Sequence, residues 1–330
     1  AVSVRTAHPT AASPKLLLRF SLQSGAYEYE SCACSRDPGE KCELDAFVTT
    51  ISNTLSDARR QLQTVSPSPD ADASILLCQI LGCSSSHLIA WPDKELTPQQ
   101  AAKYTKVLKR RLDGEPIAYI TGVKEFWSLS LKVSQAVLIP RPETETLVEF
   151  VLDRFSKRAR MRIADLGTGS GAIACALAAE HPDWNIVATD NSAAALKIAT
   201  TNASTLELDN IHFIQGSWFE PIEGRVFDLI ISNPPYVADD DCHLTQADVR
   251  FEPLNALAAG AEGLDAIHIL TRRAGDYLDT DGWLIIEHGY DQQPAVLDCF
   301  QHNGFVEIVQ LTDLAALPRA TAGRYIRSGA

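Results

Sequence analysis

The 330-residue sequence lacks several features that would place it in a specialised class of protein. No apolar run approaches the roughly 18 residues that a membrane-spanning helix needs. None of the eight cysteines has C-x-x-C spacing, and the one cluster, Cys32, Cys34 and Cys42, has no nearby histidine to complete a zinc site. The net charge of −13 argues against a nonspecific grip on nucleic acid, which needs clustered Lys and Arg. We therefore expect no membrane span, no metal site and no stable nucleic-acid binding.

What is present is typical of an ordinary globular protein. Hydrophobic residues make up 45% of the chain and charged residues 22%, and the length is sufficient for two domains with sizeable cores. Cys78, Cys175 and Cys299 lie in apolar, helix-like patterns, which is typical of reduced core thiols. This use of cysteine predicts a reducing compartment such as a cytosol.

Residues 1–42 differ from the rest of the chain because they have no clear hydrophobic periodicity. The first twenty include Arg5, Lys15 and Arg19 with several Ser and Thr and no acid, which faintly resembles a transit peptide. An extension upstream of the natural start is the alternative interpretation. We expect this segment to be an addition to the domains that follow.

From Leu44 to Leu112 the pattern is helical, which predicts a small helical bundle. In its first part, apolar residues recur at four-residue spacing, at Phe47, Ile51 and Leu55. A helix is expected at 75–81, with Asp72 or Ser74 as its cap and Gly82 at its end. Another helix opens at Thr97-Pro98. The basic residues on the last helix, Lys103, Lys106, Lys109, Arg110 and Arg111, are interpreted as a solvated face.

After Gly114-Glu115-Pro116 the pattern changes to strands and then alternates between strands and helices. Leu129, Leu131 and Val133 alternate with polar residues, and Ile139-Pro140-Arg141-Pro142 predicts an extended loop before a helix that Thr144 could cap. Strands are expected at 163–166, 186–189, 211–214, 227–232 and 283–286, with helices at 172–179, 192–201 and 265–278. This alternation indicates an α/β fold with a mostly parallel sheet covered on both faces.

Asn233-Pro234-Pro235-Tyr236 is the most informative segment of the chain. The two prolines lack N–H donors and fix φ, so the apolar strand 227–232 must end there in a rigid loop. This places an amide, free backbone carbonyls and an aromatic face at the carboxyl end of a strand, the edge where open α/β sheets bind ligands. Acceptors beside a flat ring suit a planar –NH2 group, although a turn that merely ends a strand is the alternative.

A second motif follows the strand at 163–166. Asp165-Leu166-Gly167-Thr168-Gly169-Ser170-Gly171 has alternate glycines that allow close backbone approach to a ligand at a helix N-terminus. Asp190 ends the next strand, where its carboxylate can accept hydrogen bonds from ribose hydroxyls or act only as a helix cap. Trp218 follows the third strand and could stack on adenine or belong to the core. A nucleoside cofactor that carries a carboxylate but no pyrophosphate, S-adenosylmethionine, fits this set.

Together these motifs resemble the class I methyltransferases that modify amino or amide nitrogens. More narrowly, the chain resembles the protein-(glutamine-N5) methyltransferases that act on bacterial peptide release factors, over roughly residues 43–330. The resemblance also covers Gly114–Ile120, Glu125-Phe126-Trp127, Ile139–Glu145, Asp248–Pro253 and Glu287-His288-Gly289.

The resemblance implies a Rossmann-like, mostly parallel seven-stranded sheet with a small N-terminal helical bundle and a connecting β-hairpin. The implied organisation is an extension at 1–42, a helical substrate-recognition domain at 43–116, a β-hairpin linker at 117–141 and a methyltransferase domain at 142–330. The implied partners are peptide chain release factors, and we expect a monomer in the bacterial cytoplasm, with mitochondria as the alternative location.

The resemblance also implies a role for each site residue. Catalysis would use Asn233, Pro234 and Tyr236, and the substrate would contact these residues together with Pro235 and Arg141. The cofactor S-adenosylmethionine would be held by Gly167, Thr168, Gly169, Ser170, Gly171, Asp190, Trp218 and Asn233. His288 is interpreted as a structural histidine.

Three other functions fit parts of the pattern. An adenine-N6 methyltransferase would offer the same loop to an exocyclic amine, but the acidic charge and the lack of an obvious target-recognition domain disfavour it. A glutamine methyltransferase for a ribosomal protein would differ only in its partner, and Arg141–Glu145 favours the release-factor branch. A noncatalytic binding module would not need the glycine loop, the acid and Asn-Pro-Pro-Tyr together.

Overall fold

The computed structural model describes residues 18–20, 27–29, 49–246 and 248–326. Two compact units are present, residues 1–48 and 49–330. In the first, the described part is an antiparallel pair, β1 (Leu18–Phe20) and β2 (Tyr27–Tyr29). The expectations for Phe47 and the three clustered cysteines fall outside the described residues. No helix in the described ranges combines the length and apolarity that crossing a membrane requires.

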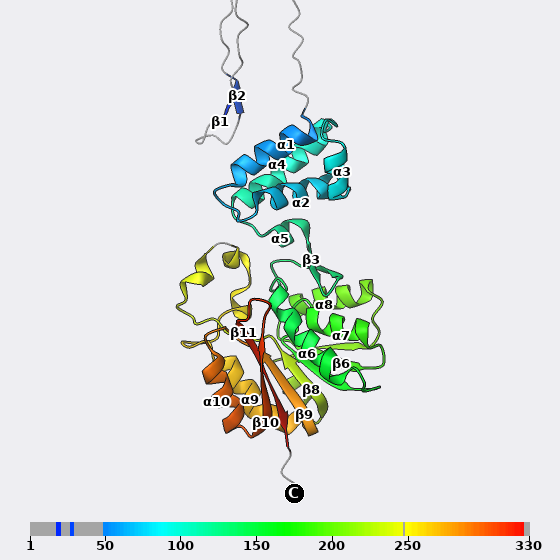
Figure 1. Cartoon of the computed structure of the whole chain (residues 1–330), viewed down its shortest axis with the longest axis vertical. Helices are drawn as coiled ribbons and strands as arrows, with labels where there is room; N and C mark the ends of the chain where they lie inside the picture. Colours follow the sequence, from blue (N-terminus) through cyan, green and yellow to red (C-terminus); the bar gives the residue numbers. More distant parts are fainter. Residues whose placement is uncertain (1–17, 21–26, 30–48, 247, 327–330) are drawn as a thin grey trace, which may run out of the picture. The chain divides into compact units, whose positions relative to one another are not determined.

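The second unit begins with the predicted helical bundle (Figure 1). Its helices are α1 (Ile51–Leu62), α2 (Pro69–Leu81), α3 (Ser85–Ala90) and α4 (Pro98–Leu112). α4 begins as predicted, because the Thr97 hydroxyl accepts from the Gln100 N–H and the Gln100 side chain accepts from the Thr97 N–H. The helices share a core that includes Leu55, Leu62, Leu76, Leu77, Tyr104 and Leu108.

Two local predictions in the bundle are wrong, and they concern two residues that pair with each other, Asp72 and Arg111. α2 begins at Pro69, six residues before the predicted start, so neither Asp72 nor Ser74 caps it. Asp72 lies in the first turn of α2, and its carboxylate accepts from the Arg111 Nε at 2.7 Å. Arg111 is only 3% exposed, so it does not belong to the solvated basic face.

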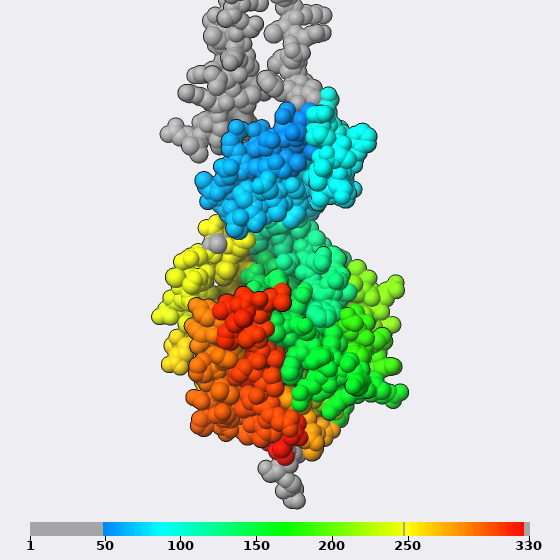
Figure 2. Space-filling model, in the orientation of Figure 1, coloured from blue at the N-terminus to red at the C-terminus, as the bar shows by residue number. Residues whose placement is uncertain are grey.

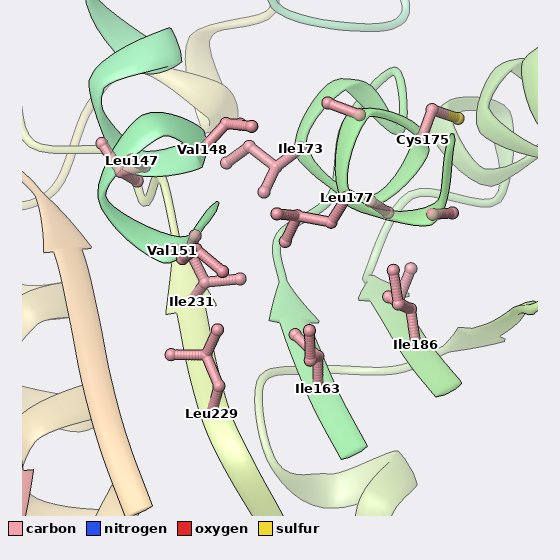
Figure 3. Close-up of a cluster of buried hydrophobic side chains, with 14 of the residues drawn as sticks. Leu147, Val148, Val151, Ile163, Ile173, Cys175, Leu177, Ile186, Leu229 and Ile231 are labelled. Carbon is pink, nitrogen blue, oxygen red and sulfur yellow. The ribbon is translucent and has the colours of Figure 1, made fainter. Parts of the chain in front are cut away.

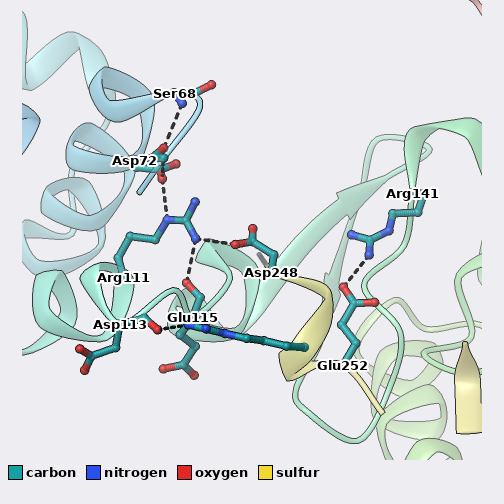
Figure 4. A network of polar contacts seen from close by, with 10 residues as sticks. Ser68, Asp72, Arg111, Asp113, Glu115, Arg141, Asp248 and Glu252 are labelled. Atoms are coloured by element: carbon teal, nitrogen blue, oxygen red, sulfur yellow. Dashed lines mark hydrogen bonds and ion pairs between the residues drawn. The ribbon is translucent and has the colours of Figure 1, made fainter. Parts of the chain in front are cut away.

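Arg111 also joins the bundle to the loop that follows β8 (Phe227–Ser232) (Figure 4). Its Nη1 donates to the Asp248 carboxylate at 2.8 Å and to the Glu115 carbonyl at 3.1 Å. Nearby, the Arg250 guanidinium donates to the Asp113 carbonyl at 2.5 Å. The space-filling view shows this loop, in yellow, against the bundle in blue and cyan (Figure 2).

A short connection follows α4. It consists of α5 (Ile117–Thr121) and the hairpin of β3 (Val123–Phe126) and β4 (Leu129–Lys132), so residues 117–121 are helical where strand was expected. The proline-rich loop then leads through η1 (Pro142–Thr144) into α6 (Glu145–Phe155). Thr144 precedes α6 but makes no capping hydrogen bond, because its hydroxyl is used in the site described below.

The rest of the unit is a seven-stranded sheet with helices on both faces. The strands besides β8 are β5 (Arg162–Leu166), β6 (Asn185–Asp190), β7 (Ile211–Gln215), β9 (Leu278–Glu287), β10 (Phe305–Thr312) and β11 (Pro318–Tyr325). Their order is β10-β11-β9-β8-β5-β6-β7, and β11 alone runs opposite to the other six strands. The connecting helices are α7 (Ala172–Glu180), α8 (Ala193–Thr205), α9 (Asp265–Tyr277) and α10 (Gln293–His302), with short turns η2 (Glu220–Ile222), η3 (Cys242–Thr245), η4 (Val249–Phe251) and η5 (Leu254–Ala256).

Alternate residues of each central strand face opposite layers of helices. In β5, Ile163 packs with α6 and α7, whereas Ala164 and Leu166 face the layer of α9 and α10. Figure 3 shows the first of these cores, with Leu147 of α6 and Leu177 of α7 above the strands. Burial on both faces explains why these strands are almost continuously apolar, as the sequence indicated.

The buried ion pair between α2 and α4 generates a prediction about stability. Asp72→Ala should leave the Arg111 guanidinium without one of its two carboxylates and lower the free energy of unfolding by about 3 kcal/mol. Asp57→Ala removes the exposed pair with Arg60 and should cost less than about 1 kcal/mol. Urea unfolding followed by circular dichroism measures both, and equal losses in the two variants would contradict the assigned role of Asp72.

Candidate active site

The predicted site residues converge at one edge of the sheet. β5 lies between β8 and β6. The chain passes from β5 to β6 and β7 on one side and then returns to form β8 on the other side of β5. Such a change of winding direction leaves a crevice outside the carboxyl ends of the strands. The glycine loop after β5, Asp190 at the end of β6 and Asn233 after β8 all lie there.

The glycine loop has the backbone that its sequence predicts. Gly167, Gly169 and Gly171 have φ values of 76°, 57° and 80°, in the left-handed region that favours glycine. Gly171 also leaves little room for a side chain, since a Cβ there would lie 3.1 Å from the Cβ of Ala199. The loop therefore passes tightly into α7 and presents its backbone to the crevice.

Asp190 and Trp218 lie beside this loop. The Asp190 carboxylate accepts from the Gly169 N–H at 2.9 Å and from the Ser192 N–H at 2.8 Å, so it fixes the loop and the start of α8 together. The Trp218 ring faces Gly167, 3.6 Å from where a Cβ would stand on that glycine. Both side chains line a cavity that also includes Thr168 and Ser170.

Two hydrogen bonds hold the end of β8, one from Ser232 and one from Asn233. The Ser232 hydroxyl donates to the Leu166 carbonyl at 2.6 Å, which ties the ends of β8 and β5. The Asn233 Nδ2 donates to the Thr144 Oγ1 at 3.1 Å. The Asn233 Oδ1 is buried and has no partner among the described residues. A buried acceptor without a donor is costly, which marks Oδ1 as an atom that a ligand can satisfy.

The rest of Asn233–Tyr236 is also fixed. The Tyr236 hydroxyl donates to the Glu287 Oε1 at 3.2 Å, and the Tyr236 carbonyl accepts from the Gln292 side chain at 2.9 Å. Burial raises the pKa of Tyr236, so it remains a neutral phenol. The Pro234 carbonyl, in contrast, receives no hydrogen bond from any described residue.

Two cavities meet at Asn233. The first contains the residues predicted to bind a cofactor, except Gly171, and includes Pro235; the second is lined by Asn233, Pro234, Tyr236 and Arg141. Pro235 lines the first of these cavities and not the second. Arg141 is half-buried at the second cavity, and its guanidinium donates to the buried Glu252 carboxylate at 2.6 Å. An acceptor amide between two cavities can hold a planar nitrogen of one ligand against a group of another.

Three buried polar residues at the site had no predicted role in binding or catalysis. They are Thr144, Asp165 and Glu287. Burial raises the pKa of Asp165 to about 7, while a hydrogen bond from the Thr168 hydroxyl acts to lower it. Burial raises the pKa of Glu287 to about 7 as well, while the Thr144 and Tyr236 hydroxyls act in the opposite direction. Glu287 is an acid that ends the apolar run of β9, and this position was the available signal for a role at the site.

His288 has the structural role that the sequence favours. Its Nε2 lies 2.9 Å from the Thr321 hydroxyl and its Nδ1 2.9 Å from the Gly289 carbonyl, and the ring is fully buried. Burial lowers the pKa of His288, so the ring is neutral. Both ring nitrogens are therefore occupied within the fold.

Family comparisons agree with this geometry. Residues 53–122 match the family described as the PrmC N-terminal domain, and residues 143–252 match the methyltransferase small domain. A methyltransferase from Pyrococcus furiosus of known structure is 14% identical, with a TM-score of 0.46, and the match covers 68% of this chain and 100% of that one. Most of the residues that line the first cavity fall within the 143–252 match, so the site belongs to the class of methyltransferase domains.

Full-length relatives narrow this class to one family. A release factor glutamine methyltransferase of Coxiella burnetii is 49% identical over 275 residues, which cover 83% of this chain and 99% of the relative. The protein of the same name from Escherichia coli K12 is 46% identical over 272 residues, covering 82% and 97%. The chain belongs to the release factor glutamine methyltransferase family.

The two buried acids generate a prediction about pH. In the fold, Asp165 and Glu287 hold their protons up to about pH 7, whereas in the unfolded chain they lose them near pH 4. The folded state therefore binds more protons between about pH 4 and pH 7, and the stability present below that window is lost as the pH rises through it.

We expect Asp165→Asn to reduce this loss, because one of the two titrating groups is gone. Urea unfolding at about pH 5.5 and about pH 8 measures the free energy of unfolding at each pH. One fully buried acid should make these two free energies differ by on the order of 1–3 kcal/mol. Wild-type protein and variant with the same dependence on pH would show that Asp165 does not titrate in this range.

Proposed function

We propose that this protein transfers the methyl group of S-adenosylmethionine to the side-chain amide nitrogen, N5, of the glutamine in the Gly-Gly-Gln sequence of peptide chain release factors. The observation that carries the proposal is the Asn233 Oδ1, a buried acceptor without a donor where two cavities meet. The names of the relatives supply the substrate.

The first cavity would hold S-adenosylmethionine. The first turn of α7, which begins at Ala172 directly after the glycine loop, would offer backbone N–H groups to the methionine carboxylate. Asp190 has lone pairs left after its two backbone bonds and would accept from the ribose hydroxyls. Trp218 would pack on adenine. The sulfonium methyl would then point toward Asn233, which lines the same cavity.

The second cavity would hold the glutamine amide. Its two N–H groups would donate to the Asn233 Oδ1 and the Pro234 carbonyl, and the Tyr236 ring would pack against the amide plane. The nitrogen lone pair attacks the methyl carbon while the carbon–sulfur bond breaks, and its electrons remain on sulfur. The nitrogen then releases a proton, so no strong base is required before attack. Orientation of this kind can supply on the order of 7–11 kcal/mol.

Recognition of the release factor would involve surfaces outside the crevice. Arg141 lies at the mouth of the second cavity and would contact the substrate backbone. The helical segment 43–116 would bind the body of the release factor, with 117–141 as the linker to the catalytic domain 142–330. Because release factors act on ribosomes, the bacterial cytoplasm is the proposed location.

The substrate can be tested directly. Labelled S-adenosylmethionine is offered with a release factor that carries Gly-Gly-Gln and with its Gln→Ala variant. We expect label on the first protein only. Label on both, or on neither, would remove the proposed substrate, and label on added DNA or RNA would favour adenine methylation instead.

Asn233→Ala should abolish methyl transfer, with a loss of about 100-fold or more, because the acceptor that positions the nitrogen is gone. Cofactor affinity, measured by isothermal titration, should stay within about threefold, since the glycine loop and Asp190 are intact. A large loss of cofactor binding in this variant would contradict the role given to Asn233.

Asp190→Ala should have the reverse effect. Its affinity for S-adenosylmethionine should fall by about tenfold to 100-fold, as expected when charge-assisted hydrogen bonds are lost. The turnover number at saturating cofactor should change less than the affinity does. Unchanged cofactor binding would mean that Asp190 only ties the glycine loop to α8.

A further inference from the structure

We propose that Thr144 and Glu287 are positioning residues that orient the Asn233 side-chain amide, so that its carbonyl oxygen and not its amino group faces the nitrogen to be methylated. The inference rests on the proposed function, since it concerns the same reaction. It assigns a role to two buried residues that the mechanism above does not use.

The orientation of this amide decides whether the site can work. An asparagine amide has an acceptor on one side and two donors on the other. If the amide turned over, Asn233 would point N–H groups at the N–H groups of the glutamine amide, and the two would repel. The observed orientation places Nδ2 on Thr144 at 3.1 Å and leaves Oδ1 without a partner among the described residues.

Thr144 can hold the amide this way only if its own proton points elsewhere. A threonine hydroxyl has one proton to donate and lone pairs to accept. When the Thr144 proton is donated to the Glu287 carboxylate, its oxygen can only accept from Asn233. The Tyr236 hydroxyl donates to Glu287 Oε1, while Oε2 is buried without a hydrogen-bond partner among the described residues. The Thr144 hydroxyl lowers the pKa of Glu287, as a donor beside this carboxylate would. The direction of one proton thus fixes the amide.

The fold brings these residues to one point. β8 and β9 run parallel, with Ser232 opposite Ile286, so Asn233 and Glu287 each follow a paired residue. Thr144 approaches from η1, at the end of the proline-rich loop. Thr144 is 4% exposed and Glu287 1% exposed, which leaves little access for water that could replace either hydrogen bond.

The charge on Glu287 is controlled by groups from every element packed around it. Tyr236 follows β8, Arg319 lies on β11, and Glu143 and Thr144 belong to η1. Arg319 favours the ionised carboxylate and Glu143 opposes it. The ionised form accepts both hydroxyl protons, so it is the form that orients Asn233.

Three substitutions test the proposal. Thr144→Val keeps the shape but removes the acceptor, and its turnover number should fall about tenfold or more. Thr144→Ser keeps the hydroxyl and should remain within about threefold of wild type. In Glu287→Gln, the new amide can donate to Thr144, which would send the threonine proton toward Asn233 and invert it; a fall of about tenfold or more is expected.

The dependence of turnover on pH separates positioning from a merely structural role. In the wild type, turnover should fall as the pH drops through about 7, because protonated Glu287 no longer accepts from Thr144. Glu287→Gln should lack this ionisation, while its affinity for S-adenosylmethionine stays within about threefold. The same pH profile in wild type and variant, or loss of activity in Thr144→Ser equal to that in Thr144→Val, would overturn the proposal.

A measurement without turnover keeps this inference separate from the proposed function. The Asn233 Nδ2 protons, assigned by their loss in Asn233→Asp, should exchange slowly with solvent in nuclear magnetic resonance spectra. Protection should persist in Thr144→Ser and disappear in Thr144→Val. Protection that is unchanged in Thr144→Val would refute the positioning role even if no release factor were methylated. Absence of methylation by the wild type would refute only the substrate.

Discussion

The hydrogen bond from the Asn233 Nδ2 to the Thr144 Oγ1 is the contact on which the arrangement of the crevice depends. It spans 89 residues of sequence and joins the proline-rich loop before α6 to the end of β8. Because the amide has two different sides, occupying its donor side with Thr144 leaves its acceptor side for a ligand. One hydrogen bond therefore joins these two segments and leaves a hydrogen-bond acceptor where the two cavities meet.

The sheet supplies the precision that this contact needs. Parallel pairing brings the ends of β5, β6 and β8 to one edge, and side chains then lock the ends together. The Ser232 hydroxyl binds the Leu166 carbonyl, and the Asp190 carboxylate binds the Gly169 N–H. The same side chains that terminate strands thus fix the glycine loop, and a ligand meets a surface already held in place. This prior ordering lowers the entropy that binding costs.

The parts of the fold that depend on neighbouring residues could be predicted from the sequence. The parts that depend on contacts between residues far apart in the sequence could not. Thr97-Pro98 and the prolines of Asn233–Tyr236 act within a few residues, so their sequence signals are sufficient. Asp72 looked like a cap because Arg111, 39 residues later, is invisible to a local pattern. Thr144 failed as a cap for the same reason, since its partner is Asn233. The antiparallel position of β11 depends on pairing with β9 and β10, which no local pattern encodes.

The buried Arg111 connects the stability of the bundle to the shape of the second cavity. It holds Asp72 of α2 and Asp248 of the loop after β8, and the next residue of that loop, Val249, lines the second cavity. Farther along the same loop, Glu252 holds Arg141, which lines that cavity from the other side. Arg111 is buried, so it needs these carboxylates, and breaking its pair with the buried Asp72 would be costly. One guanidinium therefore joins the bundle to the loop that forms part of the wall of the second cavity.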